Sequence, residues 1–389
     1  HKKRFIEKFS LIKRKRHKGN LIWFHAASVG ELMSIIPLIQ EIEKNKTIKT
    51  VLITTSTLSS SKIFENFKFK KTVHQFFPID LKYFTLRFLE YWQPTIAIFI
   101  DSEIWPSMFR EIKKKSVPLI LMNARITKKS FNKWKFFKSF SRNTFGKIDI
   151  AYPSNIETFY YLKKLEINKI KKIGNLKFTD SKNSNKRLLS KSFVLSLKKR
   201  LIWVASSTHP SEETLVGKAH IHLRKKFKNL LTIVIPRHVN RVKEIKDELE
   251  TLNLKTVIRS SKQKISSKTD MYLVDSYGEN KKFFKIAKMI FMGVSIVNHG
   301  GQNPIEPARY GLNIVHGPNV GNFKDIFKLF KKKKIAFQIN SRNQLITVIQ
   351  KLLVRPDKNK FNLKKIGKSI LKKTVIEITE IFKNEIKKT

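Results

Sequence analysis

The 389-residue sequence contains no cysteine, which excludes disulfides, thiolate metal sites and cysteine nucleophiles. It also lacks any apolar run close to the roughly 18 to 20 residues needed to cross a bilayer. This stretch is therefore not expected to be integral to a membrane. Because it begins with His1 rather than methionine, the sequence leaves open a signal or membrane anchor upstream.

Acidic residues are scarce. Only 29 Asp and Glu face 81 Lys and Arg, which gives a formal net charge of +52. The electric field of such a positive charge attracts nucleic acid, an anionic membrane surface and a phosphorylated substrate alike. Charge alone does not choose among these partners, and a compositional bias of solvated faces toward lysine is an equally simple explanation for much of it.

Several catalytic motifs are also missing. No G-x-G-x-x-G follows the first expected strand, which argues against a dinucleotide-dependent oxidoreductase. The ten histidines show no H-E-x-x-H spacing and no G-x-S-x-G is present, so zinc proteases and serine hydrolases are disfavoured.

What the sequence does contain predicts an α/β protein with two domains. An apolar fraction of 41% and 30 Phe supply material for a core, and the length suggests more than one. Short apolar runs alternate with amphipathic stretches, a pattern typical of parallel sheets built from β-α units. The expected strands are 21–25, 51–54, 95–100 and 119–123 in the first half and 201–205, 230–235, 271–274 and 288–292 in the second. The polar stretch 179–191 is the expected linker, and 363–388 has helical periodicity.

In the first half, carboxylates follow two expected strands. Glu31 lies between a strand and a helix, where the helix dipole would favour its charged form and it could act as a general base. An ordinary first-turn glutamate is the alternative. Asp101 and Glu103 follow a strand expected to be buried, and are either hydrogen-bonded scaffolding or part of the same site. A metal site there is disfavoured for want of His or Cys partners.

In the second half, two segments are suited to a nucleotide. Pro236 and Arg237 end an expected strand, where an arginine can bind a phosphate. The stretch VSIVNHGGQNPIEPARYG has paired glycines that let backbone N–H groups approach a phosphate, followed by a helix start and by Glu306, which can accept ribose hydroxyls.

With these residues in view, the chain resembles the Kdo (3-deoxy-D-manno-octulosonic acid) transferases from about Arg4 to the C-terminal helix. Ten motifs carry the resemblance in order: SVGE at 28–31, TTST at 54–57, FFPID at 76–80, DSEIWP at 101–106, NARIT at 123–127, GNLKF at 174–178, ASSTHPSEE at 205–213, PRH at 236–238, DSYGEN at 275–280 and GGQNPIEPA at 300–308.

The resemblance implies a GT-B fold of two Rossmann-like domains. It places an acceptor-binding domain at 1–178, a linker at 179–198, a CMP-Kdo-binding domain at 199–362 and a C-terminal helix at 363–389. The implied catalytic base is Glu31, and Glu103 and Lys177 would support the transition state. The implied CMP-binding residues are Pro236, Arg237, Tyr277, Gly278, Glu279, Asn303, Pro304, Ile305 and Glu306.

Four positions depart from the family pattern. Asp101 replaces a usual Glu, Ser60 a usual Gly, Val294 the second Gly of a GGS element, and Gln302 a usual His. None is the implied base or Arg237, so the reaction is expected to be unchanged while finer acceptor and donor contacts differ.

The resemblance further implies an inverting, metal-independent transferase that moves Kdo from CMP-Kdo onto the lipid A precursor, lipid IVA, in lipopolysaccharide biosynthesis, without a cofactor. Its expected location is the cytoplasmic face of the bacterial inner membrane, held by the anionic surface or by an anchor upstream of His1. The rivals are another GT-B transferase or a sugar-nucleotide epimerase, which would prefer UDP to CMP, and a nucleic-acid-binding protein, for which no recognised motif is present.

Overall fold

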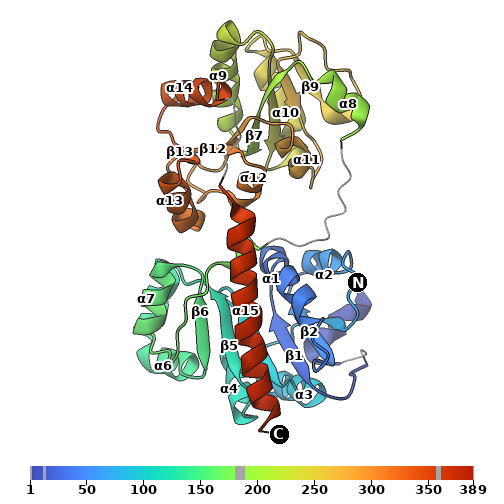
Figure 1. Cartoon of the computed structure of the whole chain (residues 1–389), viewed down its shortest axis with the longest axis vertical. Coiled ribbons are helices and arrows are strands. Elements are labelled where there is room, and N and C mark those ends of the chain that lie inside the picture. The colour runs from blue at the N-terminus through green and yellow to red at the C-terminus, as the bar shows by residue number, and fades with distance from the viewer. Residues whose placement is uncertain (1, 12–14, 180–188, 356–360, 389) are drawn as a thin grey trace. The chain divides into compact units, whose positions relative to one another are not determined.

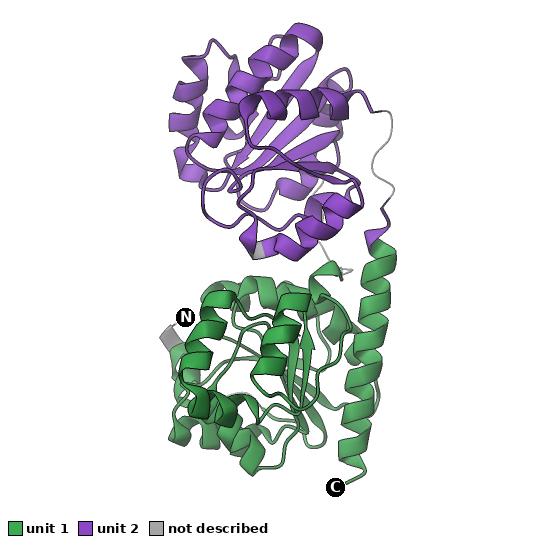
Figure 2. Cartoon of the chain, turned by 90° about the vertical axis from the view of Figure 1, so that its left-hand side faces the viewer, with its two compact units in different colours: residues 1–184, 364–389 green, residues 185–363 purple. Residues whose placement is uncertain are grey.

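The structure is a computed structural model that describes residues 2–11, 15–179, 189–355 and 361–388. The chain divides into two compact units (Figure 2). Unit 1 comprises residues 1–184 and 364–389, and unit 2 comprises residues 185–363. Residues 180–188 of the expected linker, 179–198, lie outside the described residues. Of the other linker residues, Lys191–Ser196 forms α8.

Unit 1 is built on a six-stranded parallel sheet (Figure 1). The strand order is β3-β2-β1-β4-β5-β6. Its strands are β1 (Leu21–His25), β2 (Thr50–Thr55), β3 (Thr72–Phe76), β4 (Ile96–Ile100), β5 (Leu119–Ala124) and β6 (Ile150–Pro153). Its α-helices are α1 (Val29–Ile42), α2 (Leu58–Phe64), α3 (Lys82–Trp92), α4 (Pro106–Lys114), α5 (Lys128–Phe136), α6 (Lys138–Phe145), α7 (Ile156–Lys164) and nearly all of α15 (Leu363–Ile386).

Unit 2 contains a seven-stranded parallel sheet with the order β13-β12-β11-β7-β8-β10-β9. Its strands are β7 (Leu201–Thr208), β8 (Leu230–Pro236), β9 (Thr256–Ile258), β10 (Met271–Leu273), β11 (Met289–Met292), β12 (Asn313–His316) and β13 (Ala336–Gln338). Besides α8, its α-helices are α9 (Glu212–Lys226), α10 (Val242–Glu250), α11 (Asn280–Phe284), α12 (Ile305–Arg309), α13 (Lys324–Lys332) and α14 (Arg342–Leu353).

The predicted α/β class is confirmed, and all eight expected strands form, most with ends within two residues of the prediction. The central strands were predictable because they are buried on both faces and therefore read as continuous apolar runs; every residue of β1 and β4 is buried. Five further strands, β3, β6, β9, β12 and β13, were not predicted. They lie at or near the sheet edges and are short or partly exposed, so their apolar signal is weak.

The predicted C-terminal helix is confirmed as α15, and its apolar face packs on unit 1. Ile378 and Phe382 are fully buried, and Glu377 forms an ion pair with Lys171 at 2.8 Å. A side chain at Gly367 would place its Cβ 2.3 Å from the carbonyl oxygen of Phe178. Glycine at this position therefore lets α15 lie directly against the segment that carries Lys177.

Among the described residues, no helix is both long and apolar enough to span a membrane.

Candidate active site

In unit 1 the expected catalytic residues lie where the strand order reverses. From β1 the chain adds β2 and β3 on one side and β4, β5 and β6 on the other. Such a switch point leaves room for a ligand outside the carboxyl ends of the strands. Glu31 follows β1, and Asp101 and Glu103 follow β4, which pairs directly with β1. The topology therefore brings the two carboxylate segments to the same position at the sheet edge.

Glu31 is held by the start of its own helix. Ser28 is the N-cap of α1, and its hydroxyl donates to Glu31 Oε1 at 2.7 Å. The backbone N–H of Ala27 donates to Glu31 Oε2 at 2.8 Å. Beside it, a Cβ added to Gly30 would meet nothing within 4 Å. The carboxylate is thus oriented by two donors next to open space.

The charge state of Glu31 differs from the expectation. The helix N-terminus was expected to favour the ionised form, but burial raises the pKa of Glu31 to about 7. The hydrogen bond from Ser28 opposes this shift, whereas the charges of Glu103 and Asp101 add to it. Burial, which disfavours the charged form, is thus the largest effect on the pKa of this carboxyl group. A carboxylate with a pKa near neutrality is well matched to general-base catalysis.

Glu103 is positioned by two ring N–H groups. Its Oε2 accepts a hydrogen bond from Trp105 Nε1 at 2.9 Å and lies 3.2 Å from Nε2 of the fully buried His25. Burial lowers the pKa of His25, which favours the neutral ring. Thr54 lies 3.0 Å from His25 Nδ1, so its hydroxyl can donate there while Nε2–H donates to Glu103. His25 and Trp105 were not predicted as site residues; the signal for His25 was a polar residue ending an apolar strand.

Lys177 joins the same group of residues through Asp101. Its Nζ lies 3.1 Å from Asp101 Oδ2, and both side chains are largely buried. Asp101 has a φ of 61°, a left-handed conformation that is uncommon outside glycine but tolerated by aspartate. Asn123 Oδ1 accepts from the N–H of Leu176 at 2.9 Å and so fixes the short helix Leu176–Phe178. The predicted residues Glu31, Glu103 and Lys177 are thus brought together, with Asp101 as the link.

In unit 2 the strand order reverses between β7 and β11. Glu212, fully buried at the start of α9, joins the loops that follow these two strands. Its carboxylate accepts from the backbone N–H groups of His209, Val294, Ser295 and Ile296 at 2.8 to 3.2 Å. Sequence reasoning gave Glu212 no role, although the ASSTHPSEE motif contains it.

Arg237 lies beside this switch point at the end of β8. Its backbone N–H donates to the carbonyl of Thr208 at 3.0 Å, and its exposed guanidinium has no hydrogen bond or ion pair within the described part of the chain. Nearby, the ring centroid of His209 lies 5.3 Å from that of His238 and 5.2 Å from that of His299. This histidine cluster was also missed from the sequence, because its members are far apart along the chain.

The paired glycines adopt left-handed conformations, with φ of 80° at Gly300 and 75° at Gly301. The sequence predicted that the N–H of Gly301 is available to a phosphate. It instead donates to the carbonyl of Val294 at 3.0 Å. Asn303 Oδ1 accepts from the N–H of Ile305, just after Pro304, the N-cap of α12. That helix has only five residues, so its dipole is small.

The remaining expected nucleotide-binding residues differ in availability. Tyr277 is 72% exposed, and Gly278, with a φ of 79°, has open space around it. Glu279 is engaged by Arg259, Lys282 and Ser276. Burial acts to raise the pKa of Glu279, but its contacts lower that pKa to about 2, and the hydrogen bond from Arg259 is the strongest of them. Glu306 forms an ion pair with Lys281 at 3.2 Å.

Three comparisons bear on identity. The sequence profile of the family described as 3-Deoxy-D-manno-octulosonic-acid transferase (kdotransferase) matches residues 3–180. A 3-deoxy-D-manno-octulosonic acid transferase from Rickettsia felis is 37% identical over 91% of this chain and 75% of its own length. One from Haemophilus influenzae is 28% identical over 90% of this chain and 83% of its own length.

Among solved structures, UDP-GlcNAc 2-epimerase from Neisseria meningitidis, bound to UDP-GlcNAc, superposes with a TM-score of 0.61. The match covers 94% of this chain and 100% of that one at 11% identity, so it shows a shared fold and no shared activity. The expected GT-B fold of two Rossmann-like domains is thereby confirmed. The identity to the rickettsial enzyme over three quarters of that enzyme's length shows the family. The chain belongs to the 3-deoxy-D-manno-octulosonic acid transferases, glycosyltransferases of lipopolysaccharide biosynthesis.

Proposed function

We propose that this chain transfers Kdo from CMP-Kdo to lipid IVA with inversion of the anomeric centre and without a metal. The observation that carries the proposal is Glu31, a carboxylate with a pKa of about 7 that two donors hold at the switch point of unit 1. Membership of the family supports the choice of sugar. The resemblance supplies the CMP donor and the lipid acceptor.

Glu31 acts as the general base in this proposal. It removes the proton from the primary hydroxyl of the glucosamine disaccharide while that oxygen forms a bond to the anomeric carbon of Kdo. The bond between the anomeric carbon and the CMP phosphate oxygen breaks, and CMP leaves as an anion. Direct displacement on one face of the sugar gives inversion. A nucleoside monophosphate is a good leaving group, so no strong acid is required.

Glu103 and Lys177 act beside the base. Both ring N–H groups donate to Oε2 of Glu103, and its Oε1 atom forms no hydrogen bond with the described residues. It is therefore free to accept from an acceptor hydroxyl. Lys177, balanced by Asp101, contributes a positive charge at the same edge of the sheet, where it supports the negative charge that develops during transfer.

Unit 2 binds the donor. The exposed guanidinium of Arg237 has no partner among the residues that the structure describes, and it is the group best suited to neutralise the departing phosphate. The other proposed CMP contacts are Pro236, Tyr277, Gly278, Glu279, Asn303, Pro304, Ile305 and Glu306. Because Glu279 is held by Arg259 and Lys282, we assign it to fixing the Tyr277–Gly278 turn for the nucleotide.

The charge surplus supports a location at an anionic surface. With a formal charge of +52, the chain is attracted to the anionic lipids of the cytoplasmic face of the bacterial inner membrane, where each basic residue near the surface contributes about 1 kcal/mol. A bisphosphorylated lipid acceptor lies in that same surface. We therefore propose peripheral attachment there, alone or together with an anchor upstream of His1.

One assay tests the donor, the acceptor and the independence from a metal. The protein is incubated with CMP-Kdo and tetraacylated lipid A precursor, with and without EDTA, and the masses of the lipid products are measured by mass spectrometry. We expect a product heavier by one or more Kdo residues in both samples, because Arg237 rather than a metal neutralises the phosphate. No product with CMP-Kdo, or a product that EDTA abolishes and magnesium restores, would contradict the donor or the metal-independent mechanism respectively.

A further inference from the structure

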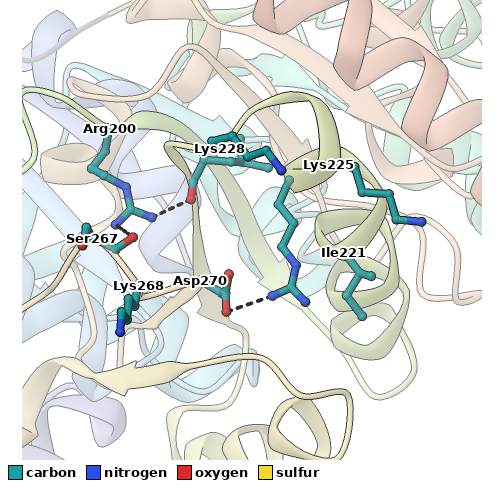
Figure 3. Close-up of a pocket in the computed structure, with 9 residues that line it drawn as sticks. Arg200, Ile221, Lys225, Lys228, Ser267, Lys268 and Asp270 are labelled. Atoms are coloured by element: carbon teal, nitrogen blue, oxygen red, sulfur yellow. Dashed lines mark hydrogen bonds and ion pairs between the residues drawn. The ribbon is translucent and has the colours of Figure 1, made fainter.

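Unit 2 contains a pocket of about 430 Å³ (Figure 3). It lies at the amino ends of the strands, opposite the carboxyl ends where the nucleotide site is proposed. Arg200 directly precedes β7, Leu230 begins β8 and Asp270 directly precedes β10, and all three line the pocket. In a parallel sheet the amino ends of the strands share one edge and the carboxyl ends the other. The pocket is therefore separate from Arg237, which follows the carboxyl end of β8.

The side chains that line this pocket are predominantly positively charged. Five basic side chains line it against a single carboxylate, that of Asp270. This carboxylate already lies 3.2 Å from His220 Nε2 and 3.2 Å from Arg224 Nη1, and accepts from the N–H of Lys255 at 2.9 Å. Burial acts to raise the pKa of Asp270, but its contacts lower that pKa to about 2, and the hydrogen bond with His220 is the strongest of them. Its negative charge is thus committed to neighbours within the protein.

Arg200 supplies a fixed positive charge that no carboxylate of the described residues contacts directly. Its guanidinium donates to backbone carbonyls alone, those of Asn229 at 3.0 Å, Ser266 at 2.7 Å and Thr269 at 2.6 Å among them. These neutral acceptors hold the side chain in place without forming an ion pair with it, and Asp270 acts on its charge only at a distance. An arginine stays protonated in proteins, so the pocket carries this cation under all ordinary conditions.

Three lysines complete the lining: Lys225, Lys228 and Lys268. No hydrogen bond or ion pair joins their ammonium groups to any residue that the structure describes. Three further donor groups are therefore available to a ligand at the rim of a pocket whose arginines are already ordered.

The surplus of lysine in the sequence does not by itself produce such a pocket. A second pocket, of about 290 Å³ in unit 1, is lined by four carboxylates and only two lysines. Its charged residues are Asp149, Lys169, Lys171, Glu377, Glu380 and Glu385. Positive charge is therefore not spread evenly over the concave surfaces of the chain, and its concentration around Arg200 is a local property.

We propose that the pocket around Arg200, Lys228 and Lys268 binds a multiply charged phosphate group, distinct from the nucleotide of the donor. Each ammonium can donate to a phosphate oxygen, and an anion with at least two charges would offset the local excess. The phosphate can come from a soluble diphosphate or from the phosphate monoester headgroup of a lipid, and the chemistry of recognition is the same.

Calorimetric titration of the full chain with inorganic pyrophosphate, in excess CMP, tests the proposal. The variant Lys228→Ala/Lys268→Ala removes two lining cations and is compared with Lys328→Ala/Lys332→Ala, which removes two exposed lysines of α13. We expect the pocket variant to bind pyrophosphate at least about tenfold more weakly. The control should change by less than about twofold. Both variants should keep the wild-type melting temperature, since all four side chains are exposed.

Equal weakening in the two variants would overturn the proposal, because it would show that the overall charge alone attracts the anion. An unchanged affinity in the pocket variant would overturn it as well. Sedimentation with vesicles containing phosphatidic acid then separates the two sources. Loss of vesicle binding in the pocket variant alone indicates a lipid headgroup, whereas loss of pyrophosphate binding with vesicle binding intact indicates a soluble phosphate.

Discussion

Glu212 accepts a hydrogen bond of 2.8 Å from the backbone N–H of Val294, a buried valine whose φ is 59°. The left-handed region is unfavourable for a β-branched residue. The family pattern that the sequence resembles implies glycine at this position, and glycine adopts that conformation without strain. This chain therefore keeps the backbone geometry of a glycine with a valine in its place, and the buried carboxylate of Glu212 helps to hold it.

Val294→Gly should consequently destabilise unit 2 less than an ordinary loss of a buried valine. Relief of the left-handed strain returns about 1 to 2 kcal/mol, which offsets part of the lost burial. The matched control is Val274→Gly, another fully buried valine just after a strand but without a positive φ. Urea denaturation of both variants measures the difference, and an equal loss of stability would show that Val294 is not strained.

Glu31→Gln should abolish transfer, with a decrease of at least about a hundredfold as expected for the loss of a general base. The fold should be retained, because glutamine can still accept from Ala27 N–H and contact Ser28. Glu41→Gln, at the other end of α1, is the control and should remain active. Rates are measured with CMP-Kdo and lipid IVA, and activity of the Glu31 variant within a few-fold of wild type would remove Glu31 from this role.

The rate should also depend on pH in a defined direction. A base must be ionised before it can accept a proton, and the pKa of Glu31 is about 7. Activity should therefore fall as the pH decreases from 8 to 6, with an apparent pKa near neutrality rather than near 4.5. A profile that is flat down to about pH 5 would contradict this assignment of the titrating group.

Glu31 should lower the stability of the folded chain at alkaline pH. Its pKa is raised on folding from 4.5 to about 7, so the native state binds its proton more tightly than the unfolded state does. This contribution to stability is fully present below about pH 4.5 and is lost as the pH rises through 7. The melting temperature of Glu31→Gln relative to wild type should increase between pH 5 and pH 8. A constant difference would show that burial does not shift this carboxyl group.

Arg237→Ala should weaken CMP binding by about 1.5 to 3 kcal/mol, the value for a hydrogen bond to a charged group. Its guanidinium has no partner among the described residues, so the substitution should not disturb the fold. Lys243→Ala on α10 removes the same charge from an exposed position and should leave the affinity unchanged. Calorimetry that finds equal CMP affinity for wild type and Arg237→Ala would remove Arg237 from the nucleotide site.

Local sequence patterns were sufficient for much of the fold and for the order of the motifs. The apolar runs of β1 and β4 identify themselves because both faces of a central parallel strand are buried. Glu31 could be placed after β1 because an apolar run precedes it and an amphipathic run follows it in the sequence. These signals lie within a few residues of one another, so no knowledge of distant contacts is needed to read them.

Tertiary structure decided the properties that depend on residues far apart in the chain. The pKa of Glu31 reflects burial and two carboxylates more than 60 positions away, which together exceed the lowering effect of its local hydrogen bonds with Ser28 and Ala27. Lys177 meets Asp101 across 76 positions, and Glu212 holds Val294 across 82. The sequence by itself determined the buried central strands, the C-terminal helix and which motif residues follow those strands, because hydrophobic periodicity is local. Packing alone determined which charges meet, how far each is removed from water and therefore which of them are available for chemistry.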